Sequence, residues 1–474
     1  MSTQLSIIIL YLAVTIVIGI LARKRSSSSK SFHGAGLGVI MCVAISTGEW
    51  LGGTSTTGIA EYGYNYGVSG AWFTIANGIG IIVFALFFAR LYRSLETLTV
   101  PGIIERYINV NARIISSILL TFIMIVVGTA QIIAAGSLGV TVLGMNYITS
   151  VLLFGLGFIV YTLAGGMVAI GYTSILHLIT MYGGVILTLL LVNNDIGGIG
   201  VMKKVLPATP FFHWIGIGKT QVSSWIIASV LGACTAQASI QPILAAKDVN
   251  VAQKSSLITA FFVAPFGVLT ALLGIAARIK FPNLPDAKLA LPTLMMNLNP
   301  LAGGIILASV LAAILSTISP VILGAGTMIT KDIYQRILRP KATERQLLIV
   351  SKVITGLAGV ICIGLAILFY KSTMILDLMY FAYTLRGALF IILFLGIYWR
   401  RTSPIGAIGA MIATSLVGFF WVSYKAEFGY FPIHANFTQT YAAIITALFC
   451  TIVLSLICPD KVGNPNSIAG GKEN

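Results

Sequence analysis

The amino-acid sequence predicts an all-α protein that crosses a membrane many times, with one transmembrane domain over residues 1–459 and a polar, disordered cytoplasmic tail over residues 460–474. Of its 474 residues, 57% are hydrophobic and only 9% are charged, whereas a soluble globular domain carries roughly 25% charged residues. The apolar residues gather into stretches that each approach the roughly 20 residues a helix needs to cross a bilayer. Most positive charges fall between these stretches, on one side of the membrane. A soluble fold is therefore excluded for almost the whole chain.

About thirteen spans can be traced in order along the chain. They lie near residues 3–22, 36–60, 67–92, 112–138, 147–165, 167–192, 223–246, 256–278, 300–328, 348–370, 374–399, 404–424 and 438–458. The first stretch, Leu5 to Ala22, has no basic residue before it and a Lys/Arg cluster after it. A signal peptide has the opposite polarity, so we expect this stretch to be a retained span. The fifth and sixth spans are separated only by Gly165 and Gly166.

The basic residues give the predicted orientation. They outnumber acidic residues 29 to 13, for a net charge of +16. About 20 of them fall on one side of the predicted spans, about 8 on the other, and Arg386 alone lies deep inside a span. Because Lys and Arg mark the cytoplasmic side, we expect the N-terminus outside, the C-terminus inside, and segments 194–222 and 279–299 as extracellular caps. Cytoplasmic loops account for the charge without a nucleic-acid partner, and the short loops suit a bacterial inner membrane.

The second span is interrupted near its middle. Between Cys42 and Gly58 it contains four glycines and six Ser or Thr residues around an intramembrane glutamate, Glu49. Glycine and hydroxyl residues weaken a helix and free backbone groups that hydrocarbon cannot satisfy. Such a break is tolerated where it lines a cavity or is covered by protein. Close helix packing through small residues is the alternative, but the run of hydroxyls beside Glu49 favours a binding site.

The seventh span has a second irregular stretch, from Gly232 to Pro242, which carries several polar side chains before a helix-breaking proline. Two interrupted helices in corresponding positions of two five-span halves indicate an inverted-repeat transporter. The two repeats would cover about residues 36–192 and 223–399. Half-helix ends in such folds can face anions with amides and cations with carbonyls.

The ninth span places three oxygen-bearing residues on one helical face. Ala313, Ser316 and Thr317 are spaced i, i+3 and i+4. Hard cations prefer oxygen ligands, and two hydroxyls together with carbonyls of this helix and of the broken second span would supply neutral ones. A Ser-Thr pair in a membrane helix can instead simply bond to its own backbone, so the spacing alone leaves both interpretations open.

Several segments resemble the sodium/solute symporter family, which includes the sodium-coupled proline, galactose, sialic acid and pantothenate carriers. They are Gly303 to Ser319, Thr330 to Tyr334, the loop Leu98 to Tyr107 and the turn Tyr161 to Gly166. The resemblance covers most of the chain. It implies about thirteen spans in the leucine-transporter inverted-repeat fold, in agreement with the two interrupted helices.

The same resemblance implies a sodium site between the second and ninth spans. The matching residues are Ala313 through its carbonyl and Ser316 and Thr317 through their hydroxyls. Aligning the second span on its aliphatic-Ser pair adds the carbonyls of Cys42 and Ile45, and an alignment on the nearby tryptophan would shift this register by one or two residues.

One coupling sodium is expected, because the chain departs from members that hold two. Many members have Trp-Thr-Asp-x-x-Gln at the start of the sixth span, where this chain has Tyr172, Thr173, Ser174 and, in place of the glutamine, His177. Pro320 also stands where those members have a serine, and it offers no side-chain oxygen.

Ionisable groups at membrane depth are costly and indicate functional sites. Away from the span ends they are Glu49, His177 and Arg386. Arg386 could bind a substrate carboxylate bidentately or pair with Glu49 as a structural counter-charge. His177 could be a proton site or a satisfied core histidine.

Four polar residues complete the candidate substrate pocket: Gln131 on the fourth span and Thr235, Gln237 and Gln241 on the seventh. Each side chain could equally form a hydrogen bond that holds two helices together. Sialic acid carriers of the family have an arginine on the fourth span, and Thr129 stands near that position here. A small zwitterion or carboxylate therefore fits better than sialic acid.

The sequence thus predicts a sodium-coupled secondary transporter that imports a small organic solute by alternating access, as a monomer in the bilayer. An enzyme is not expected, because the HExxH, GxSxG and paired acidic motifs are absent from the sequence. A proton-coupled carrier of the same fold, with Glu49 or His177 as the proton group, is the alternative.

Overall fold

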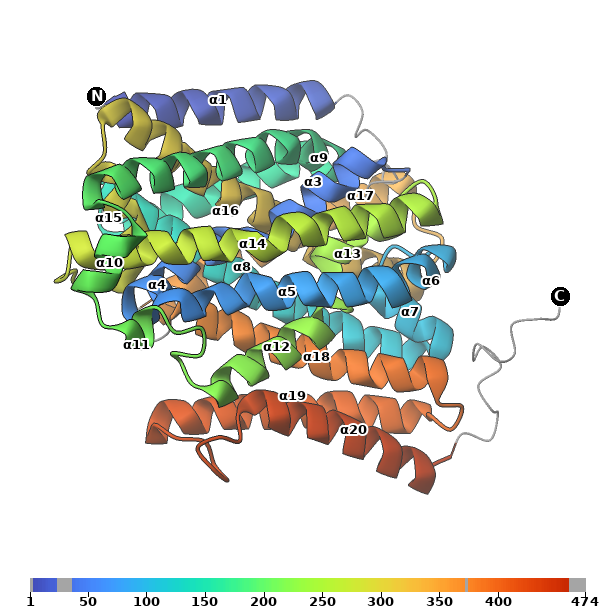
Figure 1. Cartoon of the computed structure of the whole chain (residues 1–474). Coiled ribbons are helices and arrows are strands. Elements are labelled where there is room, and N and C mark those ends of the chain that lie inside the picture. Colours follow the sequence, from blue (N-terminus) through green and yellow to red (C-terminus); the bar gives the residue numbers. More distant parts are fainter. Residues whose placement is uncertain (1–2, 24–35, 371–373, 460–474) are drawn as a thin grey trace.

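The computed structural model describes residues 3–23, 36–370 and 374–459. The predicted tail over residues 460–474 lies outside these residues. The described chain is helical, apart from a single parallel bridge between Leu37 and Ala246. Figure 1 shows long helices running roughly side by side, with α1 along one side of the bundle and α19 and α20 along the other. The short helices α10, α11 and α15 gather at one end of the bundle, and α6 and α7 at the other.

The helices in the N-terminal half are α1 (Thr3–Arg23), α3 (Val39–Trp50), η1 (Thr54–Gly58), α4 (Ile59–Tyr66), η2 (Gly67–Ala71), α5 (Trp72–Val83), η3 (Phe84–Phe88), α6 (Ala89–Ser94), α7 (Val100–Tyr107), α8 (Val110–Leu143), α9 (Tyr147–Ile196), α10 (Ile199–Val205) and α11 (Ala208–Phe211). Those in the C-terminal half are α12 (Lys219–Ala233), α13 (Gln237–Leu244), α14 (Val249–Lys280), η4 (Ala287–Leu289), α15 (Ala290–Met296), α16 (Pro300–Met328), η5 (Ile329–Leu338), α17 (Glu344–Phe369), α18 (Ile375–Tyr398), α19 (Pro404–Phe428) and α20 (Gln439–Ile457).

The helix lengths fit a polytopic membrane protein. Within the described residues, 10 helices are long and apolar enough to cross a membrane, and shorter apolar helices accompany them, among them 6–19, 39–50 and 147–163. Gly67, with φ 72°, separates α4 from the following helices. Gly166, with φ 63° and ψ −171°, divides α9 at the predicted boundary between the fifth and sixth spans. The expected all-α polytopic fold is confirmed.

Two of the membrane-crossing segments are discontinuous, as the sequence predicts. The first break, residues 51–53, separates α3 from η1, and Leu51 there has non-helical backbone angles of φ −104° and ψ 52°. The second break, residues 234–236, separates α12 from α13, and Ala236 has φ −73° and ψ 81°. Leu37 bonds through both of its backbone groups to Ala245 and Lys247, so the start of one broken segment is tied to the end of the other.

Helix α16 is the central element against which the first break is placed. It packs mainly on α9, α8 and α1, and 94% of its most apolar window is buried within the protein. By contrast, only 33% of the most apolar stretch of α19 and of α20 is buried within the protein. Apolar residues on the outer helices are therefore directed at lipid, whereas the polar residues of α16 must find partners inside the bundle.

Candidate functional site

The hydroxyls of α16 meet the end of α3 at the first break. Ser316 Oγ donates to the carbonyl of Gly48 at 3.1 Å and to the carbonyl of Ala313 at 2.9 Å. Thr317 Oγ1 donates to the carbonyls of Gly48 at 2.6 Å and Glu49 at 3.1 Å. All five residues are buried. Because α3 ends at Trp50, the carbonyls of its last turn have no partner within the helix, and the two hydroxyls satisfy them.

The carbonyls of the second span differ from the expected pair. In the described part of the chain, those that accept from Ser316 and Thr317 belong to Gly48, Glu49 and Ala313 and not to Cys42 or Ile45. Cys42 and Ile45 lie inside α3, where carbonyls are engaged in bonds to the amide four residues on. Aligning the sequence of a span does not show where its helix ends, and only the end of a helix has carbonyls without a partner in the helix.

The set of oxygens suits a monovalent cation. Three carbonyls and two hydroxyls converge here without a carboxylate oxygen among the bonded atoms. Hard cations take oxygen ligands, and a neutral set of this kind favours a single charge. Among the residues that the structure describes, no group of three or more His, Cys, Asp or Glu could hold a metal ion. The residues present therefore fit sodium as a transported ion.

The side chain of Glu49 turns from this cluster toward Arg386, halfway along α18. Arg386 Nη2 lies 3.8 Å from Glu49 Oε1, with 0% and 3% of the two side chains exposed. That separation is longer than a hydrogen bond. Glu49 Oε2 and all three guanidinium nitrogens of Arg386 are buried without a hydrogen-bond partner. The guanidinium carbon lies 5.0 Å from the ring centre of Tyr383, which gives the cation one favourable neighbour.

An aromatic wall surrounds the Glu49–Arg386 pair. Tyr383 packs edge-on against Trp50 at 6.0 Å between ring centres and stacks on Phe73 at 5.7 Å. Farther along α18, Tyr380 stacks on Trp225 of α12 at 4.0 Å. Each of these rings is buried. Together with Glu49 and Arg386 they bring α3, α5, α12 and α18 to one place.

Sequence reasoning missed this wall, because aromatic residues in apolar spans are usually packing residues. It also missed Asn77 of α5, whose amide oxygen and nitrogen are buried without a hydrogen-bond partner. One signal was available for Asn77. It is an amide in the middle of an otherwise apolar span, where polar groups are costly and indicate function.

Known proteins share both the sequence pattern and the fold. The model of the sodium:solute symporter family matches residues 32–414. The chain belongs to the sodium:solute symporter family. The function thereby assigned is sodium-coupled symport, with sodium as the coupling ion.

Two relatives illustrate the range of the family. Sodium/proline symporter 2 of Staphylococcus saprophyticus is 25% identical over 93% of this chain and 91% of its own length. The sodium/mannose cotransporter SLC5A10 of Bos taurus is 26% identical over 71% of this chain, which spans 64% of that longer protein. The names of the two relatives specify different substrates, so family membership leaves the solute undetermined.

Solved structures establish the fold independently. A Na⁺-coupled sialic acid symporter, solved substrate-bound and outward-open, aligns with a TM-score of 0.80 at 19% identity, covering 97% of this chain and 99% of that one. The nucleobase-cation-symport-1 family transporter Mhp1, in a closed conformation, aligns with a TM-score of 0.60 at 13% identity over 93% of this chain and 97% of that one. The leucine-transporter-like architecture of the symporter is confirmed by these transporter folds.

Two of the four predicted pocket residues lie at the site. Gln131 of α8 supports the first break, since its Oε1 accepts from the amide of Gly53 at 2.7 Å and its Nε2 donates to Thr54 Oγ1 at 3.4 Å. Thr235 lies in the second break and donates to the carbonyl of Arg386 at 2.8 Å. Both residues position the elements that carry the Glu49–Arg386 pair.

The other two are used elsewhere in the symporter. Gln237 accepts from the amide of Val100 at 2.7 Å and donates to the carbonyl of Leu98 at 3.2 Å, which ties α13 to α7. Gln241 donates to Thr327 Oγ1 of α16 at 3.3 Å. These amides hold helices together, the alternative that the sequence left open.

His177 of α9 is bonded to α1. Its Nδ1 forms a hydrogen bond with the hydroxyl of Tyr11, and its Nε2 is buried without a hydrogen-bond partner. Ser174, one helical turn earlier, also has a buried hydroxyl without a partner. The contacts of His177 therefore place it at the interface between α1 and α9.

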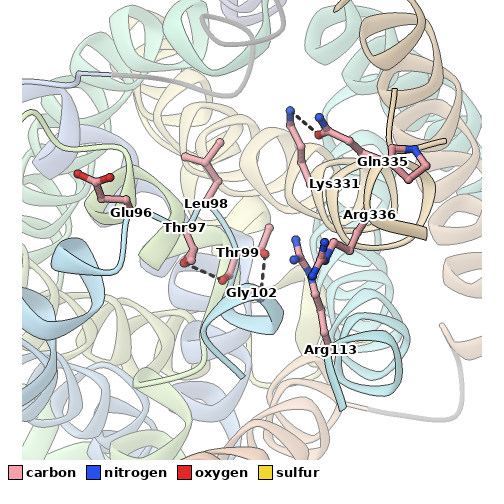
Figure 2. Close-up of a pocket in the computed structure, with 10 residues that line it drawn as sticks. Glu96, Thr97, Leu98, Thr99, Gly102, Arg113, Lys331, Gln335 and Arg336 are labelled. Carbon is pink, nitrogen blue, oxygen red and sulfur yellow. Dashed lines mark hydrogen bonds between the residues drawn. The ribbon is translucent and has the colours of Figure 1, made fainter. Parts of the chain in front are cut away.

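At one end of the symporter, an ion-pair cluster lies beside an open surface cavity of about 430 Å³. Figure 2 shows Thr97, Leu98 and Thr99 on one side of this cavity and Lys331, Gln335 and Arg336 of η5 on the other, with Arg113 between them. The buried Asp332 accepts from Thr99 at 2.8 Å and from Arg113 at 2.6 Å.

Glu105 of α7 completes the cluster. It pairs with Arg113 and, at 2.6 Å, with Arg336. Burial alone would raise the pKa of Glu105, but the hydrogen bonds and positive charges of Arg336 and Arg113 lower this pKa overall. The cluster joins α7 to α8 and η5, and its Glu105 stays ionised at neutral pH.

A second cluster closes the opposite end. Lys288 of η4 is buried and lies 3.7 Å from Glu61 of α4 and 3.9 Å from Asp286. Glu61 also accepts from the first amide of α18, that of Ile375, at 3.1 Å. The neighbouring Tyr62 donates to Asp377 of α18 at 2.6 Å. The buried Glu49–Arg386 pair therefore lies between two closed ends.

Proposed function

We propose that the symporter couples the inward movement of one sodium ion to the import of a small zwitterionic or carboxylate-bearing solute by alternating access. The observation that carries this proposal is the meeting of Ser316 and Thr317 with the free carbonyls at the end of α3. In the structure, the two hydroxyls donate to those carbonyls. A bound sodium would instead be held by the oxygens of all of these groups, with Gly48, Glu49 and Ala313 contributing carbonyls.

The bound ion would fasten α3 to α16 and so stabilise the conformation that accepts the solute. The solute then binds beside it, at Glu49 and Arg386, with Gln131 and Thr235 supporting the two breaks. The clusters around Asp332 and around Lys288 open in turn while the buried site keeps its place. Reciprocity follows from this arrangement, because sodium raises the affinity for solute only if solute raises the affinity for sodium.

The setting is also part of the proposal. We place the symporter in the plasma membrane, with its N-terminus outside and its C-terminus in the cytoplasm, because most positive charges fall on one predicted side. One transmembrane domain over residues 1–459 contains the two repeats and acts as a monomer in transport, without catalysis. The Asp332 cluster would then be cytoplasmic and the Lys288 cluster extracellular.

Direct binding of ²²Na⁺ to purified symporter tests the ion site without knowledge of the solute. The double variant Ser316→Ala with Thr317→Ala is expected to weaken sodium binding by at least about tenfold, since it removes two ligands. Ser309→Ala is the matched control, because Ser309 is buried in the same helix and bonds back to Ile306. A saturation stoichiometry near one is expected.

Unchanged sodium binding in the double variant, or two bound ions per symporter, would contradict the proposal. In proteoliposomes, solute uptake driven by a pH gradient alone would transfer the coupling to a proton. His177 would then be the residue to examine, because its Nε2 is buried without a partner.

A further inference from the structure

Glu49 belongs to two sites at once. Its backbone carbonyl accepts from Thr317 in the cluster assigned to sodium, at 3.1 Å. Its carboxylate points the other way and lies 3.8 Å from Arg386. Glu49 is the next-to-last residue of α3, so an ion that fixes the carbonyls of this turn also fixes where the carboxylate stands.

The Glu49–Arg386 pair is poorly satisfied for its depth. A buried ion pair offsets its desolvation only when the geometry is good and further hydrogen bonds satisfy the remaining groups. Here the closest recorded approach exceeds the roughly 2.7–2.9 Å of a charge-assisted hydrogen bond. One carboxylate oxygen and the whole set of guanidinium donors have no hydrogen-bond partner. If the pair had only a structural role, Glu49 and Arg386 would be expected to approach within hydrogen-bond distance of each other.

Three more buried polar groups without a hydrogen-bond partner lie in or beside the aromatic wall. The hydroxyl of Tyr380, the indole nitrogen of Trp225 and the amide of Asn77 are all buried and all lack a hydrogen bond. Tyr380 and Trp225 are stacked on one another, and Tyr380 lies 5.8 Å from Phe73 between ring centres. These groups combine apolar rings with a few hydrogen-bonding groups, a composition that suits contact with the compact body of a small molecule.

The charges decide which class of molecule completes the site. A plain carboxylate would satisfy Arg386 and leave Glu49 buried beside a second negative charge. A plain amine would do the reverse, and an uncharged sugar would leave both groups unneutralised except by each other. A molecule with one cationic and one anionic group satisfies both and keeps the buried site neutral.

We propose that the transported solute is a small zwitterion, whose anionic group binds Arg386 and whose cationic group binds Glu49, and that Glu49 couples the solute to the ion. This inference rests on the proposed sodium symport and deepens it. Binding inserts the solute into the 3.8 Å pair, and the ion holds the last turn of α3 in the position that the cationic group requires.

A matched trio of compounds tests the charge requirement. L-proline carries both charges, cyclopentanecarboxylate lacks the cationic nitrogen, and pyrrolidine lacks the carboxylate. The corresponding trios of L-alanine and L-phenylalanine vary the size of the body. Binding to the purified full-length symporter is followed as the rise in thermal unfolding temperature, with and without sodium. At least one zwitterion should bind in sodium, with each of its half-analogues at least about tenfold weaker.

Two substitutions test the assignment of each charge. Glu49→Gln should weaken binding of the zwitterion by at least about tenfold and reduce the difference in affinity between the zwitterion and its carboxylate analogue. Arg386→Gln should reduce the difference in affinity between the zwitterion and its amine analogue. A merely structural pair would lower stability without changing this order of preference. Asp195→Asn is the control, because Asp195 also pairs with a cation, Lys280 at 2.6 Å, yet lies outside the proposed site and both end clusters, and it should keep the wild-type preference.

The outcomes separate the two proposals. Sodium-dependent binding of a carboxylate or a neutral sugar in preference to every zwitterion, or no binding of any zwitterion in sodium, overturns the charge assignment and leaves sodium coupling intact. An unchanged order of preference in both variants overturns the roles of Glu49 and Arg386. Binding of a zwitterion that does not depend on sodium overturns the symport proposal instead.

Discussion

Both breaks interrupt a helix among small and polar residues, but their surroundings differ. At the first break, the freed carbonyls of Gly48 and Glu49 are met by hydroxyls of α16, short side chains that can share their acceptors with an ion. At the second break, the carbonyl of Cys234 accepts from Tyr92 and the side chain of Thr235 donates to the backbone of Arg386. In the proposed mechanism the ion therefore binds at the first break, where the hydroxyls could share the carbonyls with it.

The glutamine side chains that bond near each break also differ in what they hold. The first break is supported by Gln131 from α8, deep in the bundle. The second is followed by Gln237, which binds α7 at the end closed by the Asp332 cluster. We therefore assign the first break to ion binding and the second to the transmission of movement toward that end.

The largest difference should come from adding one methyl group at each break. A Cβ at Gly52 would lie 2.7 Å from Thr317 Cβ and 2.5 Å from Gln131 Oε1. A Cβ at Gly232 would lie 3.1 Å from the Tyr383 carbonyl oxygen and 3.3 Å from Arg386 Cβ. Gly52→Ala should lower sodium affinity by at least about tenfold, and Gly232→Ala by less than about threefold, because only the first crowds the ion site.

Measurement of ²²Na⁺ binding to the two variants checks this prediction. Thermal unfolding in the absence of sodium is the control for general damage. Equal losses of sodium affinity in the two variants would remove the distinction between the breaks.

A smaller effect is expected when each break loses its glutamine. Gln131→Leu strands the amide of Gly53, and Gln237→Leu strands that of Val100, at a cost of roughly 1–3 kcal/mol of stability in each case. The readouts should differ, since Gln131→Leu weakens sodium binding whereas Gln237→Leu leaves it unchanged and makes α7 more accessible. Hydrogen exchange of residues 100–107 with and without sodium distinguishes them. Equal protection of α7 in both variants would show that the second break does not hold it.

The smallest effect concerns α7 itself. Glu105→Gln should lower stability at pH 7 by about 1 kcal/mol or less, as expected for a partly exposed ion pair. Since the pKa of Glu105 is lowered in the folded state, its contribution is present above the pKa of the unfolded chain, about 4.3, and is lost as pH falls through the lowered value. Unfolding measured between pH 3 and 7 should show the variant and wild type converging at the acid end.

Glu427 is exposed and serves as the control for this experiment. Glu427→Gln should leave the pH dependence of unfolding unchanged. A stability difference for Glu105→Gln that persists undiminished at pH 3 would contradict the ion-pair interpretation.

Composition, span lengths and two interrupted stretches were enough to predict the fold, because hydrocarbon restricts the chain to helices and makes every break conspicuous. The spacing of Ser316 and Thr317 also placed their hydroxyls on one helical face, where the structure has them bonded to the end of α3, and their role in binding sodium stays a prediction. Their carbonyl partners were not predictable, since only the position where α3 ends determines which oxygens are free. The aromatic wall could not be predicted either, because its rings come from four helices, α3, α5, α12 and α18, whose packing no local pattern encodes.

The contact between Glu61 and the first amide of α18 has a mechanical consequence. A helix transmits displacement as a nearly rigid rod, and Arg386 lies about 16 Å along α18 from Ile375 at 1.5 Å per residue. Any movement that separates this end of α18 from α4 therefore also tilts the part of α18 that carries the Arg386 guanidinium. In the proposed mechanism, opening of the Lys288 cluster and binding of the solute by Arg386 would therefore be coupled through α18 and could not occur independently.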